Sequence, residues 1–105
     1  MSETKREGGA TVLDPETKGK TQAPRLYKIV LHNDDFTPRQ FVVMVLAQLF
    51  QKSEGDAMSI MLQAHNNGFA VVGLYSFEIA EAKVAQAMNL AKEMEFPLLM
   101  RVEPE

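Results

Sequence analysis

The sequence contains no cysteine among its 105 residues. Without thiols the chain can form no disulfide, no thiolate nucleophile and no cysteine-based metal site. Positive charge is not in excess either: the formal net charge is −3, whereas nucleic-acid binding normally requires a basic face. No apolar run is long enough to span a bilayer, and residues 1–24 lack the apolar stretch of a signal peptide. These absences predict a soluble cytoplasmic protein that binds neither nucleic acid nor membranes.

Apolar residues make up 46% of the chain, which is enough for the core of one small domain. Residues 1–24 differ from the rest because they contain few large apolar side chains and no aromatic residue. Such a segment cannot bury enough surface to offset its loss of chain entropy. We therefore expect a flexible N-terminal extension over residues 1–24 and a folded domain over residues 25–105. Composition alone leaves open whether the extension has a function.

Downstream of Pro24 the apolar residues recur with the periods of strands and helices. Tyr27, Ile29 and Leu31 alternate with their neighbours, as in a strand. The expected elements are a strand at residues 26–31, a helix from Pro38 to about Gln51, a helix from Ser53 to near Gly68, a strand from Phe69 to Tyr75, a helix from Ser76 to before Pro97, and a strand at residues 98–103. Helices on one face of a small antiparallel sheet would bury their apolar sides. The sequence thus predicts an α+β domain of order β-α-α-β-α-β, with three helices packed on a three-stranded antiparallel sheet.

Two of the expected helices carry a regular apolar stripe. In the first helix the stripe consists of Val42, Val45, Leu46, Leu49 and Phe50, and in the third it consists of Ala80, Val84, Ala87, Ala91 and Met94. We expect both stripes to face the core.

The corner between the first strand and the first helix is rich in hydrogen-bond acceptors. Thr37 can cap the helix, Pro38 suits its first position, and Gln40 completes a capping box three residues after Thr37. Asp34 and Asp35 therefore lie between two apolar elements. Such a corner is suited to hold a small cation, either a metal ion or an ammonium group. An ordinary acidic turn is the alternative, because Asn and Asp are turn residues in their own right.

His65 follows Met61 by four residues, so the two side chains share one face of the second helix. A single histidine near a helix end is most often structural or solvated. A binding role gains support from Met61 and Ala64, which offer an apolar wall on the same flank. Taken by itself, the sequence leaves both interpretations of His65 open.

Together these residues form motifs that closely resemble the signature of the ClpS family, adaptors of the bacterial AAA+ protease ClpAP. The resemblance covers about residues 25–105. It rests on six segments in the family's order: Tyr27–Pro38, Phe41–Val43, Met61–His65, Asn67–Gly68, Glu78–Val84 and Pro97–Leu98. Several separated motifs in the right order are more specific than any one of them.

The resemblance implies an adaptor rather than an enzyme, with no cofactor and no metal. Members of the family recognise proteins whose first residue is bulky and apolar, typically Phe, Tyr, Trp or Leu. The free α-amino group of such a protein is largely protonated near neutral pH and presents three donors, which an internal peptide lacks. By the resemblance, ten residues bind this N-terminal degradation signal, or N-degron: Asn33, Asp34, Asp35, Thr37, Arg39, Val42, Met61, Ala64, His65 and Leu98.

These residues divide into a polar group and an apolar group. Asn33 and Asp35 can accept hydrogen bonds from the ammonium, and His65 can serve as a further polar partner. Asp34 and Thr37 can bind the nearby peptide backbone or hold the loop. The first side chain would enter an apolar cavity, formed by Val42, Met61, Ala64 and Leu98.

The same resemblance predicts a second interaction site on the third helix. Glu78 and Lys83 match residues that contact the N-terminal domain of the ClpA unfoldase in the family. Without the resemblance, a solvated helix face would be the interpretation of both. The family uses an unstructured N-terminal extension to engage the unfoldase, which gives residues 1–24 a role. We expect a monomer whose partners are ClpA and N-degron substrates.

The chain departs from the family pattern near the expected cavity. Arg39 stands where many members have a methionine, and Ala64 stands where a valine is common. Both changes resemble a second paralogue found in some alphaproteobacteria, so the range of accepted first residues is open. Because Arg39 follows Asp35 by four residues, its guanidinium is expected to reach the acidic loop. The alternative is that Arg39 points to solvent.

Two other classes of function compete with the adaptor. Asp34, Asp35 and His65 offer ligands for several metals, so a metal site or an enzyme is conceivable. Against an enzyme, no Ser/His/Asp spacing and no glycine-rich phosphate loop is present. The second competitor is a ribosome-associated interaction domain, because small domains of this type serve many roles.

Overall fold

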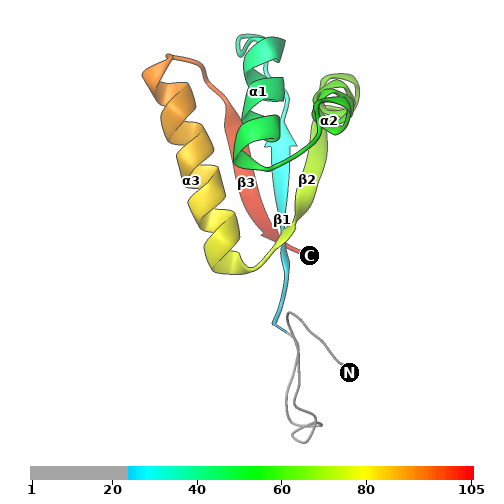
Figure 1. Cartoon of the computed structure of the whole chain (residues 1–105), viewed down its shortest axis with the longest axis vertical. Helices are drawn as coiled ribbons and strands as arrows, with labels where there is room; N and C mark the ends of the chain where they lie inside the picture. The colour runs from blue at the N-terminus through cyan, green and yellow to red at the C-terminus, as the bar shows by residue number, and fades with distance from the viewer. Residues whose placement is uncertain (1–23) are drawn as a thin grey trace, which may run out of the picture.

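The computed structural model describes residues 24–105, so the predicted extension over residues 1–24 lies outside the described residues except for Pro24. The described elements are β1 (Tyr27–His32), α1 (Arg39–Leu49), α2 (Glu54–Asn67), β2 (Phe69–Tyr75), α3 (Phe77–Glu93) and β3 (Leu99–Pro104). Their order is the predicted β-α-α-β-α-β (Figure 1).

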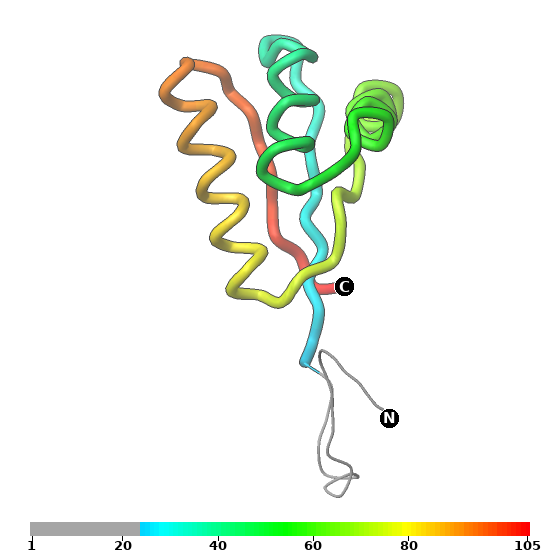
Figure 2. The backbone as a smooth tube through the Cα atoms, viewed as in Figure 1, coloured from blue at the N-terminus to red at the C-terminus, as the bar shows by residue number. Residues whose placement is uncertain are grey.

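The sheet has three antiparallel strands in the order β2-β1-β3, so β1 is its central strand. The backbone trace shows β1 running between its two neighbours, with the three helices on one side of the sheet (Figure 2). This arrangement confirms the predicted α+β fold. None of the helices within residues 24–105 is long and apolar enough to cross a membrane.

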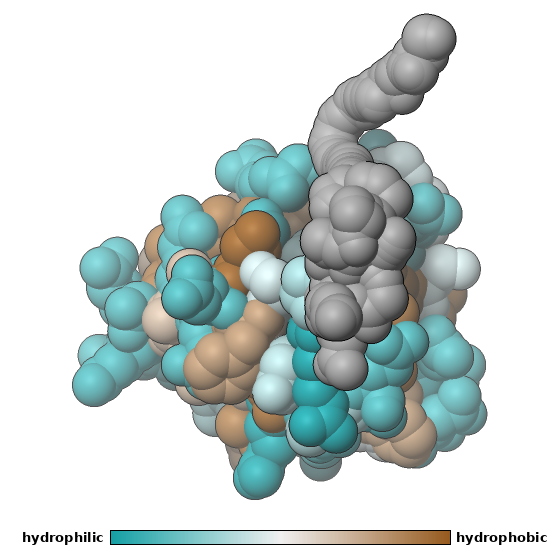
Figure 3. Space-filling model, turned by 90° about the horizontal axis from the view of Figure 1, so that it is seen from below, coloured by the Kyte–Doolittle hydropathy of each residue, from teal (hydrophilic) through white to brown (hydrophobic). Residues whose placement is uncertain are grey.

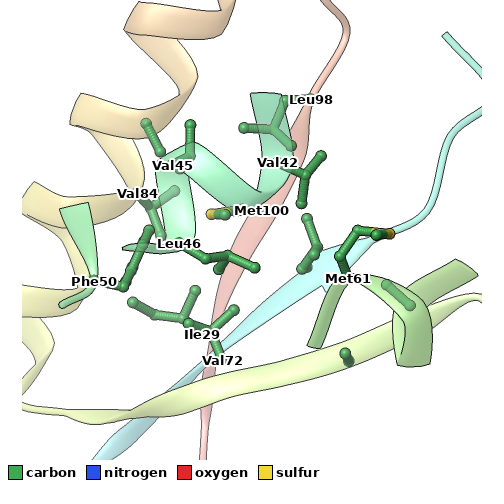
Figure 4. Packing of buried hydrophobic residues seen from close by; sticks show 14 of the residues in the cluster. Ile29, Val42, Val45, Leu46, Phe50, Met61, Val72, Val84, Leu98 and Met100 are labelled. Atoms are coloured by element: carbon green, nitrogen blue, oxygen red, sulfur yellow. The ribbon is translucent and has the colours of Figure 1, made fainter. Parts of the chain in front are cut away.

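The core lies between the sheet and the helices (Figure 4). Ile29, Leu46 and Met100 are fully buried there and come from β1, α1 and β3. Both predicted stripes face this core, with one exception. Met94 is 54% exposed, because α3 ends at Glu93 and the stripe stops with it. Every helix and strand contributes buried apolar side chains to this one core.

The ends of α2 follow the sequence signals. The Ser53 hydroxyl accepts a hydrogen bond from the backbone N–H of Asp56 at 3.1 Å, as a helix-capping serine should. Gly68 ends the helix with φ 93°, a left-handed conformation that glycine adopts without steric cost. Ser76 precedes α3 as predicted, but its side chain makes no capping hydrogen bond.

The predicted capping box at the start of α1 is wrong. Pro38 occupies the position before the helix, which begins at Arg39, and no side chain caps it. The Thr37 hydroxyl instead donates to the carboxylate of Asp34 at 2.8 Å. Since the hydroxyl is committed to the preceding loop, it is not available to the helix. At its other end α1 stops at Leu49, two residues before the predicted Gln51, whose φ of 52° is not helical.

Candidate functional site

A cavity of about 330 Å³ lies where the β1–α1 loop meets α1, α2 and the segment before β3. All ten residues expected to bind an N-degron line it: Asn33, Asp34, Asp35 and Thr37 from the loop, Arg39 and Val42 from α1, Met61, Ala64 and His65 from α2, and Leu98 from the segment before β3. Val42, Met61 and Leu98 lie near one another in Figure 4 although they come from three segments. The fold thus brings together residues up to 65 positions apart, from Asn33 to Leu98.

The base of the cavity is apolar, whereas its mouth is polar. The buried lining residues are all apolar: Leu31, Val42, Met61, Ala64 and Leu98. Asn33, Asp35 and His65 also line the cavity, and all three are exposed. An apolar cavity with a few convergent polar groups is the usual form of a ligand site. This one suits a ligand with an apolar side chain and a hydrogen-bond donor beside it.

Asp34 holds the β1–α1 loop in place. One carboxylate oxygen accepts from the backbone N–H of Phe36 at 2.8 Å and from that of Thr37 at 2.7 Å. The other oxygen accepts from the Thr37 hydroxyl. The backbone N–H of Asn33 donates to the carbonyl of Gly68 at 3.0 Å, which ties the loop to the end of α2. Of the two roles expected for Asp34 and Thr37, holding the loop is the one that the hydrogen bonds support.

Arg39 contacts His65 and not the acidic loop. Its guanidinium lies 2.9 Å from Nε2 of His65, joining the start of α1 to the end of α2 across the cavity mouth. Arginine carries only donors, so in this hydrogen bond the guanidinium donates and Nε2 accepts. The expected contact with Asp35 is therefore corrected: the first turn of α1 directs this side chain toward α2. Arg39 is exposed, but its guanidinium is hydrogen-bonded to His65 and not to Asp35.

The carboxylate of Asp34 is engaged within the acidic loop. Among residues 24–105 no group of three or more His, Cys, Asp or Glu side chains is placed to hold a metal ion. Both oxygens of the Asp34 carboxylate already accept hydrogen bonds from the loop itself. Asp34, Asp35 and His65 line the same cavity, but they are not among any set of three side chains placed to hold a metal ion in the described residues.

Glu78 and Lys83 lie on α3, and neither lines the cavity. Glu78 is exposed in the first turn, at the end of the molecule opposite the β1–α1 loop (Figure 1). Its neighbours Phe77 and Ile79 are about half exposed. Figure 3, which looks at this end, shows hydrophobic residues among hydrophilic ones. The surface there is mixed, as a rim of an interaction surface would be.

Lys83 is attached to the end of α1. Its ammonium donates to the carbonyl of Leu49 at 2.8 Å and to the side-chain oxygen of Gln51 at 3.2 Å. It also lies 5.7 Å from the ring centre of Phe50 and 5.9 Å from that of Tyr75. Burial raises the pKa of the Tyr75 phenol above its ordinary value. Lys83 thus has a structural role that the sequence did not reveal.

Four lining residues were not among the ten predicted: Leu31, His32, Phe36 and Pro38. Phe36 is the most notable, because its side chain is 78% exposed beside the mouth. Its place between Asp35 and Thr37 in the motif was the available signal. The backbone N–H of Phe36 donates to Asp34, which holds the backbone of this residue within the loop.

Comparisons with known proteins place this geometry in a family. The family described as "ATP-dependent Clp protease adaptor protein ClpS" matches residues 22–101. The chain is 48% identical to the ATP-dependent Clp protease adapter protein ClpS of Roseobacter denitrificans, over all of this chain and 93% of that protein. It is 49% identical to ClpS 2 of Rhizobium meliloti, over 85% of this chain and 88% of that protein.

A solved structure has the same fold. The structure of Agrobacterium tumefaciens ClpS2 bound to L-phenylalaninamide matches with a TM-score of 0.77 and 47% identity, over 79% of this chain and all of that chain. The predicted resemblance, including its likeness to a second paralogue, agrees with these matches.

Proposed function

The chain belongs to the ClpS family of ATP-dependent Clp protease adaptors, and from this membership we propose that it binds proteins with a bulky apolar first residue through their free α-amino group and delivers them to ClpAP. The first residues proposed are Phe, Tyr, Trp and Leu. The observation that carries the proposal is the cavity itself, which combines a buried apolar base with exposed acceptors at its mouth.

The proposed pose follows from these two halves. The ammonium donates to Asn33 and Asp35 at the mouth, where the carboxylate strengthens the hydrogen bond by its charge. The first side chain then points inward, toward Val42 and Leu98. The relative whose structure holds L-phenylalaninamide supports this pose, because that ligand has an aromatic side chain beside a free amino group.

His65 can accept a hydrogen bond from the substrate ammonium through Nε2 only after Arg39 has moved. Its Nε2 accepts from Arg39, so this nitrogen is already engaged and does not accept from an ammonium. A direct hydrogen bond from the ligand to Nε2 requires Arg39 to move away. Arg39 therefore competes with the substrate for His65, rather than for Asp35 as the sequence suggested.

The affinity for a substrate N-terminus can be approximated from the usual energies of apolar burial and of hydrogen bonds to charged groups. Burying an aromatic side chain contributes about 1.5–3 kcal/mol. Each hydrogen bond to a charged group adds on the order of 1.5–3 kcal/mol before ordering costs. Together they correspond to a dissociation constant around the micromolar range.

The decisive experiment compares a Phe-starting peptide with its N-acetylated form by fluorescence anisotropy. Acetylation removes the charge and two donors, so we expect binding to fall below detection. Asp35→Ala should weaken binding of the free peptide strongly. Asp56→Ala, which removes an exposed carboxylate outside the cavity, is the matched control and should have no effect. Equal affinity for the two peptides would sink the proposal.

Delivery requires a second experiment, because binding and delivery use different parts of the chain. We propose that Glu78, Lys83 and residues 1–24 serve the ClpA unfoldase. Deleting residues 1–24 should leave peptide affinity unchanged and block degradation of a Phe-starting reporter by ClpAP. Degradation at the full rate without residues 1–24 would exclude a role for them in delivery.

A further inference from the structure

A second, larger hollow lies between α1 and α2. This α1/α2 groove has a volume of about 670 Å³. Its middle is lined by five apolar side chains: Val43, Met44 and Ala47 from α1, and Met58 and Leu62 from α2. Met58 is 42% exposed and Leu62 is 39% exposed, so much of this apolar surface faces water. None of these five residues lines the cavity described above.

The groove continues directly from that cavity. Arg39 and Met61 line both hollows and form their common wall. The hydrogen bond between Arg39 and His65 spans the two helices at this wall. When Arg39 leaves His65, as a direct hydrogen bond from the ligand to Nε2 requires, the wall between the two hollows is reduced to Met61.

Charge and shape restrict what the groove can hold. Its polar residues stand at its ends, with Arg39 and Gln40 at the start of α1 and Glu54 at the start of α2. The middle offers no side-chain donor or acceptor, so it favours apolar side chains. Its two flexible methionines, Met44 and Met58, can adapt to side chains of different shape.

The length of the groove fits a short stretch of extended peptide. From Arg39 to Ala47, α1 rises about 12 Å at 1.5 Å per residue. An extended chain advances about 3.3 Å per residue, so the groove spans roughly three to four residues. A chain whose first residue occupies the cavity reaches this length with the residues that follow.

On these grounds we propose that the α1/α2 groove binds apolar side chains of the residues that follow the first residue of the substrate. The inference rests on the proposed function, because it needs the substrate N-terminus in the cavity. It adds a preference beyond the first residue: substrates with apolar residues at positions two to four bind more tightly than those with polar ones.

The test uses three ligands, one of a single residue and two tetrapeptides that differ in polarity. Phenylalaninamide ends after one residue and reports on the cavity alone. The peptides Phe-Leu-Leu-Ser-amide and Phe-Ser-Ser-Ser-amide differ only at positions two and three, and adjacent leucines cover both sides of an extended chain. In the wild-type protein calorimetry should show the leucine peptide binding about ten-fold more tightly, as expected for partial burial of one leucine side chain.

Substitutions in the groove test whether the preference for the leucine peptide over the serine peptide arises there. Leu62→Ser and Met58→Ser should each reduce the ten-fold ratio between the two peptides to about two-fold. Phenylalaninamide, measured with the same variants, gives the baseline for the cavity. The matched control is Leu74→Ser, because Leu74 is 45% exposed on β2 and lines neither hollow. It should keep the ratio of the wild-type protein.

The outcomes separate this inference from the proposed function. If phenylalaninamide and both peptides fail to bind, the proposed function itself is wrong. If all three bind but the two peptides are equal, only the groove proposal is wrong. Two further outcomes would contradict the groove proposal. If the protein distinguishes the two peptides only after residues 1–23 are deleted, that segment is the occupant of the groove. If it distinguishes them only at low protein concentration, a second copy of the chain is the occupant.

Discussion

The loop before α1 and the last turn of α1 are each held by one charged side chain, but the two side chains come from opposite directions along the chain. Before the helix, Asp34 accepts hydrogen bonds from residues two and three positions later. At the other end, the ammonium of Lys83 donates to the carbonyl of Leu49 from 34 positions away. The first end is built by local sequence, and the second exists only once α3 has packed beside α1.

The comparison also separates two proposed tasks. The loop held by Asp34 forms the mouth of the cavity, whereas the junction held by Lys83 lies on the side of the molecule proposed to meet the unfoldase. In both places one charged side chain forms hydrogen bonds within the domain while a nearby one stays exposed. Asp34 is bonded and Asp35 is exposed in the loop, and Lys83 is bonded and Glu78 is exposed on α3. We therefore expect substitution of the engaged residues to lower stability, whether or not it also affects binding, and substitution of the exposed ones to affect binding alone.

The largest effect should follow from Asp34→Ala. The substitution removes the acceptor of three hydrogen bonds, each worth about 0.5–1.5 kcal/mol net, so stability should fall by about 2 kcal/mol. The collapse of the loop should also weaken binding of a Phe-starting peptide by more than ten-fold. Urea denaturation and fluorescence anisotropy would measure the two effects. Thr37→Val, which removes only the hydroxyl bond, should reproduce a fraction of both losses.

Lys83→Met tests the other end of α1 and should have a smaller effect. The variant keeps an apolar stem but loses the donor to Leu49 and the charge above two aromatic rings. We expect a loss of about 1 kcal/mol of stability, measured by urea denaturation. Peptide affinity should not change. Lys92→Met alters an exposed lysine of the same helix and is the control; equal losses in both variants would contradict the capping role.

Glu78→Lys should affect docking without affecting stability. Glu78 is exposed, so reversing its charge costs the fold little, whereas a partner surface complementary to it would be repelled. We expect a several-fold loss of affinity for the ClpA N-terminal domain in surface plasmon resonance, with an unchanged melting temperature. Glu93→Lys, the same reversal at the far end of α3, provides the control. Undiminished docking of Glu78→Lys would remove this residue from the interface.

The smallest effect is expected for Arg39→Met. Removing the guanidinium frees Nε2 of His65 and removes a cation from the mouth of the cavity. Leu- and Trp-starting peptides should then bind a few-fold more tightly, a gain on the order of 1 kcal/mol or less for an exposed charge. Calorimetry at low and high salt would check it, because the electrostatic part of the gain should shrink with salt. Identical affinities would show that Arg39 leaves His65 at no cost.

The elements that were predicted well are those whose signals are local. Ser53 and Gly68 mark the ends of α2 by their own side-chain or backbone properties, and both act as expected. The role of Thr37 was predicted wrongly because its hydroxyl has two suitable partners, each three residues away: the backbone of Gln40 and the carboxylate of Asp34. The sequence does not distinguish between them, and the structure shows the hydrogen bond to Asp34. The stripe of α3 was extended one turn too far, to Met94, because periodicity does not reveal where a helix stops.

The candidate site was predicted by a different route. The ten residues were assigned by resemblance to the ClpS family, and the structure places all of them around one cavity. Their contacts could not be assigned in this way. Arg39 meets His65 because α1 and α2 pack side by side, and the groove between these helices arises from the same packing.

By itself the sequence determined the order of the elements, the turn held by Asp34 and the family to which the chain belongs, because each depends on residues near one another in the chain or on their identity. Only the tertiary structure decided the partners of Lys83 and Arg39, since these contacts join residues 34 and 26 positions apart. It also decided the apolar base of the cavity, because Val42, Met61 and Leu98 meet only when α1, α2 and the segment before β3 pack together. Contacts of this kind depend on the distances between packed elements, and no pattern of neighbouring residues records those distances.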